Sequence, residues 1–405
     1  MTAISPTAST PWVRTLSGAV VGSATGVSAM LLYTNGLFVG DLSREFGLTR
    51  AQFGLGVLLV SIALAAANPV VGWAVDRFSP KAPSVLGLLL LSAGFASLGA
   101  FVHSTGGYLA LQTLVAFFGA ASGPIAYTKF IGATFTRRRG LALGLTMTGI
   151  GCSAAVVPPL LAAVIASMGW RNGYFALAAI PLAGALGTAL LFPSTSTART
   201  SRPDAPTPAS SEPADWLHSR VFWTLAATFA AMSLSFGGLL PHFVPMLTDG
   251  GLTPLAAGRI AGEIGLAVIA SRLVVGYLLD RVFAPWIAIA ICLVAAAGSL
   301  VLILNGISAA SVTAIAIGLA LGAELDLMGF LVARYFGLAQ FGRIYGWQYC
   351  AFVLASGLGP LWVGAVRDAT GTYVPALVAC VAGLCVTCIG FLMLPRYPVI
   401  GEGGG

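Results

Sequence analysis

The sequence predicts an all-α membrane protein in which twelve transmembrane helices form two pseudo-symmetric six-helix bundles. Three observations predict this fold class: an apolar composition, twelve apolar segments of spanning length, and motifs that recur in both halves. Hydrophobic residues make up 58% of the 405 residues and charged residues only 8%, whereas soluble domains carry about 25% charged residues. So few charges cannot cover a surface in water, and we expect lipid to be the solvent for most of this surface.

Twelve apolar segments are long enough to cross a bilayer, which requires about 20 residues. Their approximate ranges are 13–39, 50–75, 82–102, 106–134, 141–166, 171–192, 221–247, 254–279, 284–304, 309–333, 342–366 and 372–394. The first segment is longer than the roughly 7–15 residues of a secretory signal core, so we expect a retained helix.

The segment between the sixth and seventh spans separates the chain into two parts. Residues 193–219 are rich in Ser, Thr, Pro and Ala, a composition typical of a flexible linker. The predicted domains are therefore a first bundle over residues 1–192, a linker over 193–219 and a second bundle over 220–405.

Basic residues are distributed unevenly between the two ends of the predicted helices. Of the 20 Lys and Arg residues, one end holds thirteen: Arg14, Arg77, Lys81, Arg137, Arg138, Arg139, Arg199, Arg202, Arg220, Arg281, Arg334, Arg343 and Arg396. The other end holds five: Arg44, Arg50, Arg171, Arg259 and Arg367. Basic loops remain in the cytoplasm, so we expect a multi-pass protein of a bacterial inner (plasma) membrane with both termini and the linker cytoplasmic. This topology accounts for the net charge of +7 without a nucleic-acid partner.

Two motifs recur in the two halves. A G-x-x-x-D-R pattern follows the second and the eighth spans, 204 residues apart, and comprises Gly72, Asp76 and Arg77 in the first half and Gly276, Asp280 and Arg281 in the second. A second pattern, 202 residues apart, matches Gly140, Gly144 and Pro158 with Gly342, Gly346 and Pro360. Glycine lets two helices approach closely, while Asp and Arg can pair or cap helix ends. The alternative interpretation is a loop with a structural role only.

The duplicated motifs and the central linker resemble the major facilitator superfamily over residues 13–395. The resemblance implies a secondary transporter that works by alternating access, with the G-x-x-x-D-R loops as gates. The first loop departs from the family pattern, because Phe78-Ser79-Pro80-Lys81 lacks the usual glycine and paired basic residues.

Three shorter segments resemble one branch of that family, the monocarboxylate and oxalate:formate transporters. They are 42–50, 138–144 and 334–337. Eukaryotic members of the branch carry a lysine in the first helix, and this chain has none there. Proton coupling through such a lysine therefore cannot be carried over.

Four ionisable residues lie far from the predicted helix ends: Lys129, Arg272, Glu324 and Asp326. A charge at mid-bilayer costs about 2.5–3.5 kcal/mol, so all four would cost roughly 10–14 kcal/mol if they faced lipid. The whole stability of a protein is only about 5–15 kcal/mol. We therefore expect these residues, whose formal charges sum to zero, to face one another or a watery cavity.

Arg272, Lys129 and Tyr127 are the candidate substrate-binding residues. The guanidinium of Arg272 is a planar fork that fits a carboxylate, and the resemblance implies that it holds the substrate carboxylate. The alternative is a structural ion pair with Glu324 or Asp326. Lys129 and Tyr127 lie in the fourth helix, which by resemblance lines the central cavity. Their alternatives are snorkelling of Lys129 to the interface and ordinary packing of Tyr127.

Glu324 and Asp326 are the candidate proton-coupling residues. Positions two apart point about 200° apart on a helix, so both cannot face the cavity squarely. Burial favours the neutral carboxyl group and a neighbouring arginine favours the charged one. A carboxyl group balanced between these effects can exchange a proton for a partner; the alternative is a permanent pair with Arg272.

The predicted function is secondary active transport of small organic anions, specifically proton-coupled monocarboxylate symport. Two alternatives stay open: oxalate:formate-like exchange, in which two cations hold a dicarboxylate, and efflux of amphipathic compounds through an apolar pocket. The expected partners are a carboxylate substrate, protons and the lipid bilayer, and we expect a monomer without a cofactor.

The sequence does not predict an enzyme. Neither H-E-x-x-H nor G-x-S-x-G occurs, and we assign no catalytic residue. The six cysteines lie in apolar segments without metal-ligand spacing, so we expect no metal site.

Overall fold

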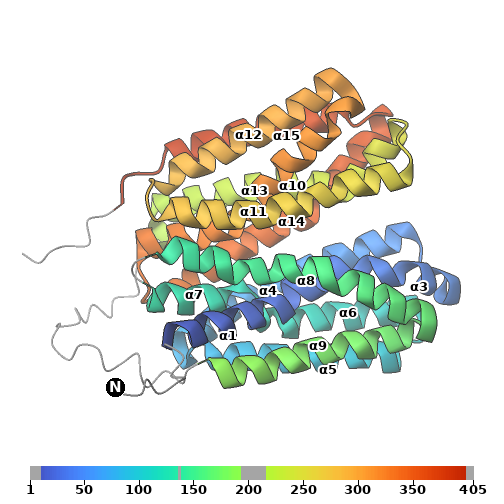
Figure 1. The fold of residues 1–405 in the computed structure, drawn as a ribbon, viewed down its shortest axis with the longest axis horizontal. Coiled ribbons are helices and arrows are strands. Elements are labelled where there is room, and N and C mark those ends of the chain that lie inside the picture. Colours follow the sequence, from blue (N-terminus) through green and yellow to red (C-terminus); the bar gives the residue numbers. More distant parts are fainter. Residues whose placement is uncertain (1–10, 136–137, 193–215, 398–405) are drawn as a thin grey trace, which may run out of the picture.

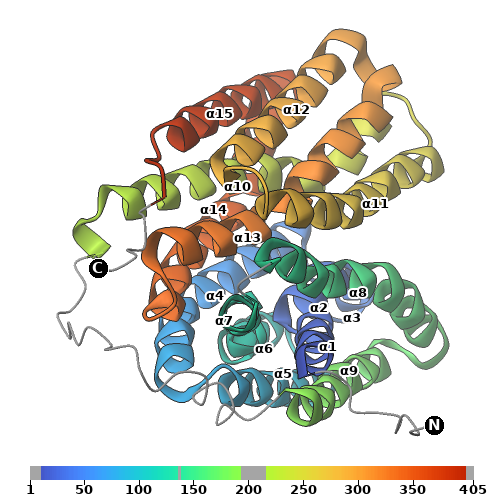
Figure 2. The same cartoon turned by 60° about the vertical axis from the view of Figure 1, so that its left-hand side comes forward.

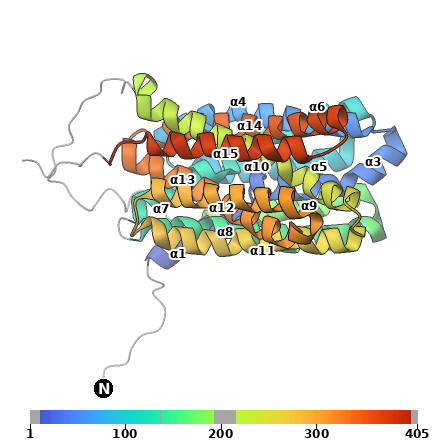
Figure 3. The ribbon, with the colours of Figure 1, turned by 90° about the horizontal axis from the view of Figure 1, so that it is seen from above.

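The computed structural model describes residues 11–135, 138–192 and 216–397, and these residues form helices and no strand. The long helices run along one common axis (Figure 3). Arg137, Arg199, Arg202, both chain ends and most of the predicted linker lie outside the described residues.

The helices of residues 11–192 form the lower group in Figure 1. They are α1 (Pro11–Thr25), α2 (Val27–Thr34), η1 (Asn35–Phe38), α3 (Val39–Phe46), α4 (Arg50–Phe78), α5 (Lys81–Phe101), α6 (Thr105–Gly119), η2 (Ala120–Ser122), α7 (Pro124–Thr134), α8 (Arg139–Met168) and α9 (Trp170–Leu191).

The helices of residues 216–392 form the upper group in Figure 1. They are η3 (Trp216–His218), α10 (Arg220–Asp249), α11 (Pro254–Leu279), α12 (Ala284–Asn305), η4 (Gly306–Ala309), α13 (Ala310–Phe336), α14 (Phe341–Thr370) and α15 (Val374–Leu392).

The number of membrane spans agrees with the prediction. Within the described residues, ten helical stretches are long and apolar enough to cross a membrane, or eleven if the bent pair Trp12–Leu31 and Asn35–Phe46 is one span. One of the ten, Ala284–Phe336, has 53 residues, far more than the roughly 20 that cross a bilayer. It consists of α12 and α13, which η4 joins and which lie side by side, since Thr313 Oγ1 donates to the Gly298 carbonyl at 2.7 Å. Counting these two helices separately gives twelve, and the all-α fold is confirmed.

Two spans that the sequence predicts as continuous are broken in the structure. The span predicted over 13–39 is interrupted at Gly26, which has an extended backbone, and the span predicted over 106–134 is interrupted at η2 and Gly123. The breaks meet: the Val27 amide, which has no helical acceptor at the start of α2, donates to Ser122 Oγ at 3.0 Å. Pro124, which has no amide hydrogen, begins α7. Irregular backbone is tolerated at membrane depth only where protein or a cavity satisfies it.

The two groups of helices meet at the end of the molecule that carries Arg77, Lys81, Arg281 and Arg343, here termed the basic end. Glycines make the contacts between α4 and α14 and between α8 and α11. A Cβ atom added to Gly342 would collide with the Gly72 carbonyl, and one added to Gly140 would collide with the Gly276 carbonyl. Figure 2 shows α8 against α11 and α13. Both crossings therefore depend on the absence of side chains at matching positions of the repeat.

The two groups separate toward the opposite end, here termed the far end. Cβ atoms added to Gly54 on α4, or to Gly258 and Gly262 on α11, would meet no atom within 4 Å in the described structure. The ribbons of the two groups diverge in the same direction (Figure 1). The structure is therefore closed between the groups at the basic end and more open at the far end.

Candidate functional site

The candidate site lies between α11 and α13, which two glycines bring close together. Cβ atoms added to Gly318 and Gly322 would lie 2.5 Å from the carbonyls of Ile264 and Val268. Glycines four residues apart lie on one helix face, so they form a smooth strip along which α11 packs. Ser271 strengthens the contact by donating its hydroxyl to the Leu319 carbonyl at 2.5 Å. This packing places the next turns of α13 beside Arg272.

Arg272 and Asp326 form the central ion pair. Arg272 Nη1 lies 3.4 Å from Asp326 Oδ1, and the two residues are 4% and 1% exposed. A distance of 3.4 Å is beyond the usual range for such hydrogen bonds. Arg272 Nε and Asp326 Oδ2 are buried and have no hydrogen-bond partner in the described structure. The pair thus retains unused donor and acceptor capacity, and leaving buried polar groups unsatisfied costs about 1–3 kcal/mol each, more for charged groups.

Glu324 is the second carboxyl group near Arg272. It is 4% exposed, and its Oε1 is buried without a hydrogen-bond partner in the described structure. Arg272 lies within electrostatic range of both Glu324 and Asp326, but only Asp326 is in contact with it. The site therefore contains one guanidinium and two carboxyl groups, all removed from water.

Three tyrosines lie near this charged cluster, of which Tyr345 and Tyr349 are buried and Tyr33 is exposed. Tyr33, Tyr345 and Tyr349 are all within electrostatic range of Arg272, and the rings of Tyr345 and Tyr349 stack with their centroids 6.0 Å apart. The hydroxyl of Tyr349 lies 3.3 Å from that of Ser28, which links α14 to α2 across the two groups. The site is therefore lined by both halves of the chain.

Sequence reasoning did not assign these tyrosines to the site. The spacing of Tyr345 and Tyr349 was a partial indication, because residues four apart share one helix face. The same spacing also occurs in ordinary packing, so it does not distinguish the two roles.

Lys129 is not brought together with Arg272. Its Nζ lies 2.6 Å from Asp76 Oδ1 and donates to the Val75 carbonyl at 3.2 Å, so it pairs with the first G-x-x-x-D-R motif. Lys129 therefore faces Asp76 and not the other three membrane-embedded charges. The long, flexible lysine side chain reaches the basic end of α4 instead.

Tyr127 lies inside the first group of helices. It is fully buried, and its ring packs edge-on against Phe192 at 6.1 Å and against Gly22 of α1. Its hydroxyl has no hydrogen-bond partner in the described structure. This placement does not bring Tyr127 to the Arg272 cluster.

The two motif aspartates cap helices of the opposite group. Asp76 accepts hydrogen bonds from the amides of Gly342 and Arg343, both at 2.8 Å, at the start of α14. Asp280 accepts from the amides of Gly140 at 2.8 Å and Leu141 at 3.2 Å, at the start of α8. A carboxylate is stabilised at a helix N-terminus by free amide groups and by the helix dipole.

The glycines of the two G-x-x-x-D-R motifs make contacts between the two groups of helices, whereas the arginines do not make the same contacts as each other. Gly72 and Gly276 form the helix crossings described above. Arg281 donates to the Tyr277 carbonyl at 3.1 Å and lies over the Tyr277 ring at 3.6 Å, whereas Arg77 borders a cavity with Gln340 and Arg343. The aspartates and glycines therefore connect the two groups, and Arg281 contacts its own helix.

Comparison with known proteins identifies the family. The sequence model of the Major Facilitator Superfamily matches residues 21–360. The chain belongs to the major facilitator superfamily. Its members are transporters and not enzymes, as predicted.

Several members of the superfamily are similar to this chain. Human monocarboxylate transporter 11 is 28% identical over 374 residues, which cover 86% of this chain and 76% of that protein. The "Probable L-galactonate transporter" of Escherichia coli is 24% identical over 391 residues, covering 88% and 84%. The crystal structure of the human organic anion transporter MFSD10 superposes with a TM-score of 0.73 at 15% identity and covers 94% of this chain and 100% of that one. The last similarity shows the fold alone, which is that of a superfamily transporter.

Proposed function

We propose that this chain is a proton-coupled carrier of small monocarboxylates that works by alternating access. The observation that carries the proposal is the single arginine beside two buried carboxyl groups. Among the residues that the structure describes, the cluster contains one cation, which suits a substrate with one carboxylate. Because Lys129 pairs with Asp76, the cluster lacks the second cation that a dicarboxylate exchanger needs.

Proton coupling follows from charge balance in the cluster. In the substrate-free site, Arg272 neutralises Asp326. A substrate carboxylate that binds Arg272 displaces Asp326 and leaves a buried carboxylate without a cation. That carboxylate takes up one proton, so the loaded site gains one anion and one proton and keeps its net charge. Glu324, buried nearby, provides a second group that can hold the proton. By reciprocity, the proton and the substrate each favour the binding of the other.

The relatives support the same substrate class. The names of human monocarboxylate transporter 11 and of the L-galactonate transporter both specify carboxylates. The stacked rings of Tyr345 and Tyr349 would suit the apolar part of a small organic acid. We propose that the basic end faces the cytoplasm, as the positive-inside rule predicts. The far end, where the two groups of helices separate, then opens to the outside of the cell. We further propose that the helices before and after the linker move as two bundles.

Transport by Glu324→Gln and Asp326→Asn tests the proposal. A thermal-shift screen of the purified protein first selects the substrate, because a ligand at 100 times its Kd raises the free energy of unfolding by about 2.7 kcal/mol. In proteoliposomes, we expect both variants to lose uptake driven by a pH gradient and to keep part of the counterflow, in which labelled and unlabelled substrate exchange. Full pH-driven accumulation in both variants would contradict proton coupling through these residues.

A further inference from the structure

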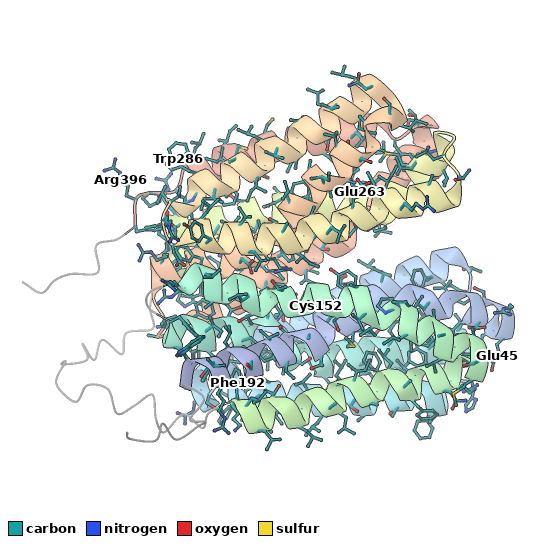
Figure 4. The ribbon with its side chains drawn as sticks, viewed as in Figure 1. Glu45, Cys152, Phe192, Glu263, Trp286 and Arg396 are labelled. Atoms are coloured by element: carbon teal, nitrogen blue, oxygen red, sulfur yellow. The ribbon has the colours of Figure 1, made fainter. Side chains whose placement is uncertain are left out.

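A groove of about 580 Å³ lies at the basic end, between the start of α12 and the end of α15. Its floor is apolar and includes Ile289, Phe391 and Leu394, while Trp286 and Arg396 border it. Figure 4 places Trp286 and Arg396 at the same corner of the molecule. This groove is separate from the Arg272 cluster and has no part in the transport mechanism proposed above.

The wall of the groove is held in place by contacts of the segment that follows α15. The hydroxyl of Tyr397 accepts a hydrogen bond from the Ala284 amide at 3.0 Å. Tyr335 donates its hydroxyl to the Pro395 carbonyl at 2.6 Å, and the guanidinium of Arg334 lies 4.6 Å from the centre of the Tyr397 ring. Contacts within the chain itself therefore form this wall, and a site that the chain itself forms lowers the ordering cost of binding.

The chemistry of the groove changes along the membrane normal. Trp286, Leu392 and Ile389 are each 57% exposed on the outer faces of α12 and α15, so these faces contact lipid chains. Trp and Tyr are typical of the membrane–water interface. Arg396 is exposed at this level, and it has no ion-pair partner among the described residues. A ligand that fits must join an apolar chain to an anionic group at the height of the lipid headgroups.

We propose that this groove binds an anionic phospholipid, with an acyl chain along the apolar floor and the phosphate at Arg396. Basic pockets between transmembrane helices on the cytoplasmic side are suited to anionic headgroups. A free phosphate ion would use Arg396 alone and would leave the apolar floor without a partner. A zwitterionic lipid would fill the floor but would bring a cationic headgroup beside Arg396.

Native mass spectrometry of the purified full chain, with phosphatidylglycerol or phosphatidylcholine of identical acyl chains, tests the proposal. We expect phosphatidylglycerol to bind more tightly, and Arg396→Gln to weaken its binding about fivefold, the effect of one basic residue near a membrane surface. Arg220→Gln is the matched control, since Arg220 is an exposed arginine at the start of α10, outside the groove. We expect this control to leave the binding of both lipids unchanged.

A second variant tests the apolar part of the groove without a change of charge. Leu392→Trp fills the groove from an exposed position, and we expect it to weaken the binding of both lipids. Equal losses in Arg396→Gln and Arg220→Gln would show a general charge effect and overturn the proposal. Full competition by inorganic phosphate, or unchanged lipid binding in Leu392→Trp, would also overturn it.

Discussion

Arg272 contacts Asp326 through Nη1 only, and its Nε has no partner in the described structure. A guanidinium can bind a carboxylate through two parallel N–H groups, which adds both strength and orientation. The free donor capacity therefore allows Arg272 to bind a substrate carboxylate in a geometry that its contact with Asp326 does not use. A lysine at this position would retain the charge and lose the fork.

We expect Arg272→Lys to lower substrate uptake in proteoliposomes by about tenfold or more, the effect of losing one hydrogen bond between charged groups. Arg259→Lys is the matched control, because Arg259 is on the same helix but exposed near the far end. Thermal stability of both variants should be measured beside uptake, to separate binding from folding. Uptake at the wild-type rate in Arg272→Lys would mean that the arginine has a structural role only.

The charged members of the cluster could be found in the sequence because a charge within a membrane is costly wherever it lies. The same criterion selected Lys129, but it does not indicate which residue pairs with the ammonium group. A lysine side chain has four rotatable carbons, so its ammonium group can lie far from the depth of its own backbone, and Asp76 receives it. Tyr345 and Tyr349 were not selected because an uncharged side chain in a membrane span carries no cost comparable with that of a charge.

At the scale of helices, the crossing of α4 and α14 depends on glycine. A side chain at Gly72 would collide with the backbone of Gly342, and backbone atoms cannot move aside as a flexible side chain can. A larger residue must therefore separate the two helices. This separation also withdraws Asp76 from the amides of Gly342 and Arg343.

We expect Gly72→Val to lower the population that is closed at the basic end. Distances between spin labels on Phe78→Cys and Arg343→Cys, measured by double electron–electron resonance, should shift to longer values. Gly54→Val on the same helix is the matched control, because a side chain there meets no atom within 4 Å. An unchanged distance distribution in Gly72→Val would contradict a glycine-dependent crossing.

The boundaries of most spans could be predicted well, but the break at Gly26 could not. A span is recognised by its mean hydropathy, which a single interruption hardly changes. Pro124 gave a local signal for the break in the fourth span. Gly26 gave no such signal, because it is one of 51 glycines in the chain. The break at Gly26 depends on Ser122, a residue remote in sequence whose hydroxyl oxygen accepts the hydrogen bond of the Val27 amide.

At the scale of the whole molecule, the distribution of basic residues predicts which end faces the cytoplasm. The test uses a chain whose six cysteines are replaced by serine and a membrane-impermeant maleimide on intact cells. We expect Gly106→Cys at the far end to be labelled directly, and Val282→Cys at the basic end to be labelled only after the cells are permeabilised. The reverse pattern would invert the orientation and the direction in which the described conformation faces.

Asp76 and Asp280 occupy the same place in the repeated motif. They differ in the polar partners that each would keep if the α4–α14 and α8–α11 crossings separated. Asp76 has a second partner, Lys129, within its own group of helices, so it keeps a cation when α14 moves away. Asp280 is bonded to amides of α8 and has no ion pair among the residues that the structure describes. If α8 moves away, the carboxylate of Asp280 loses both amide donors and is hydrated by water. We therefore expect separation of α8 from α11 to change the electrostatic surroundings of Asp280 more than separation of α4 from α14 changes those of Asp76. The two crossings share one sequence pattern and are nevertheless not equivalent in charge.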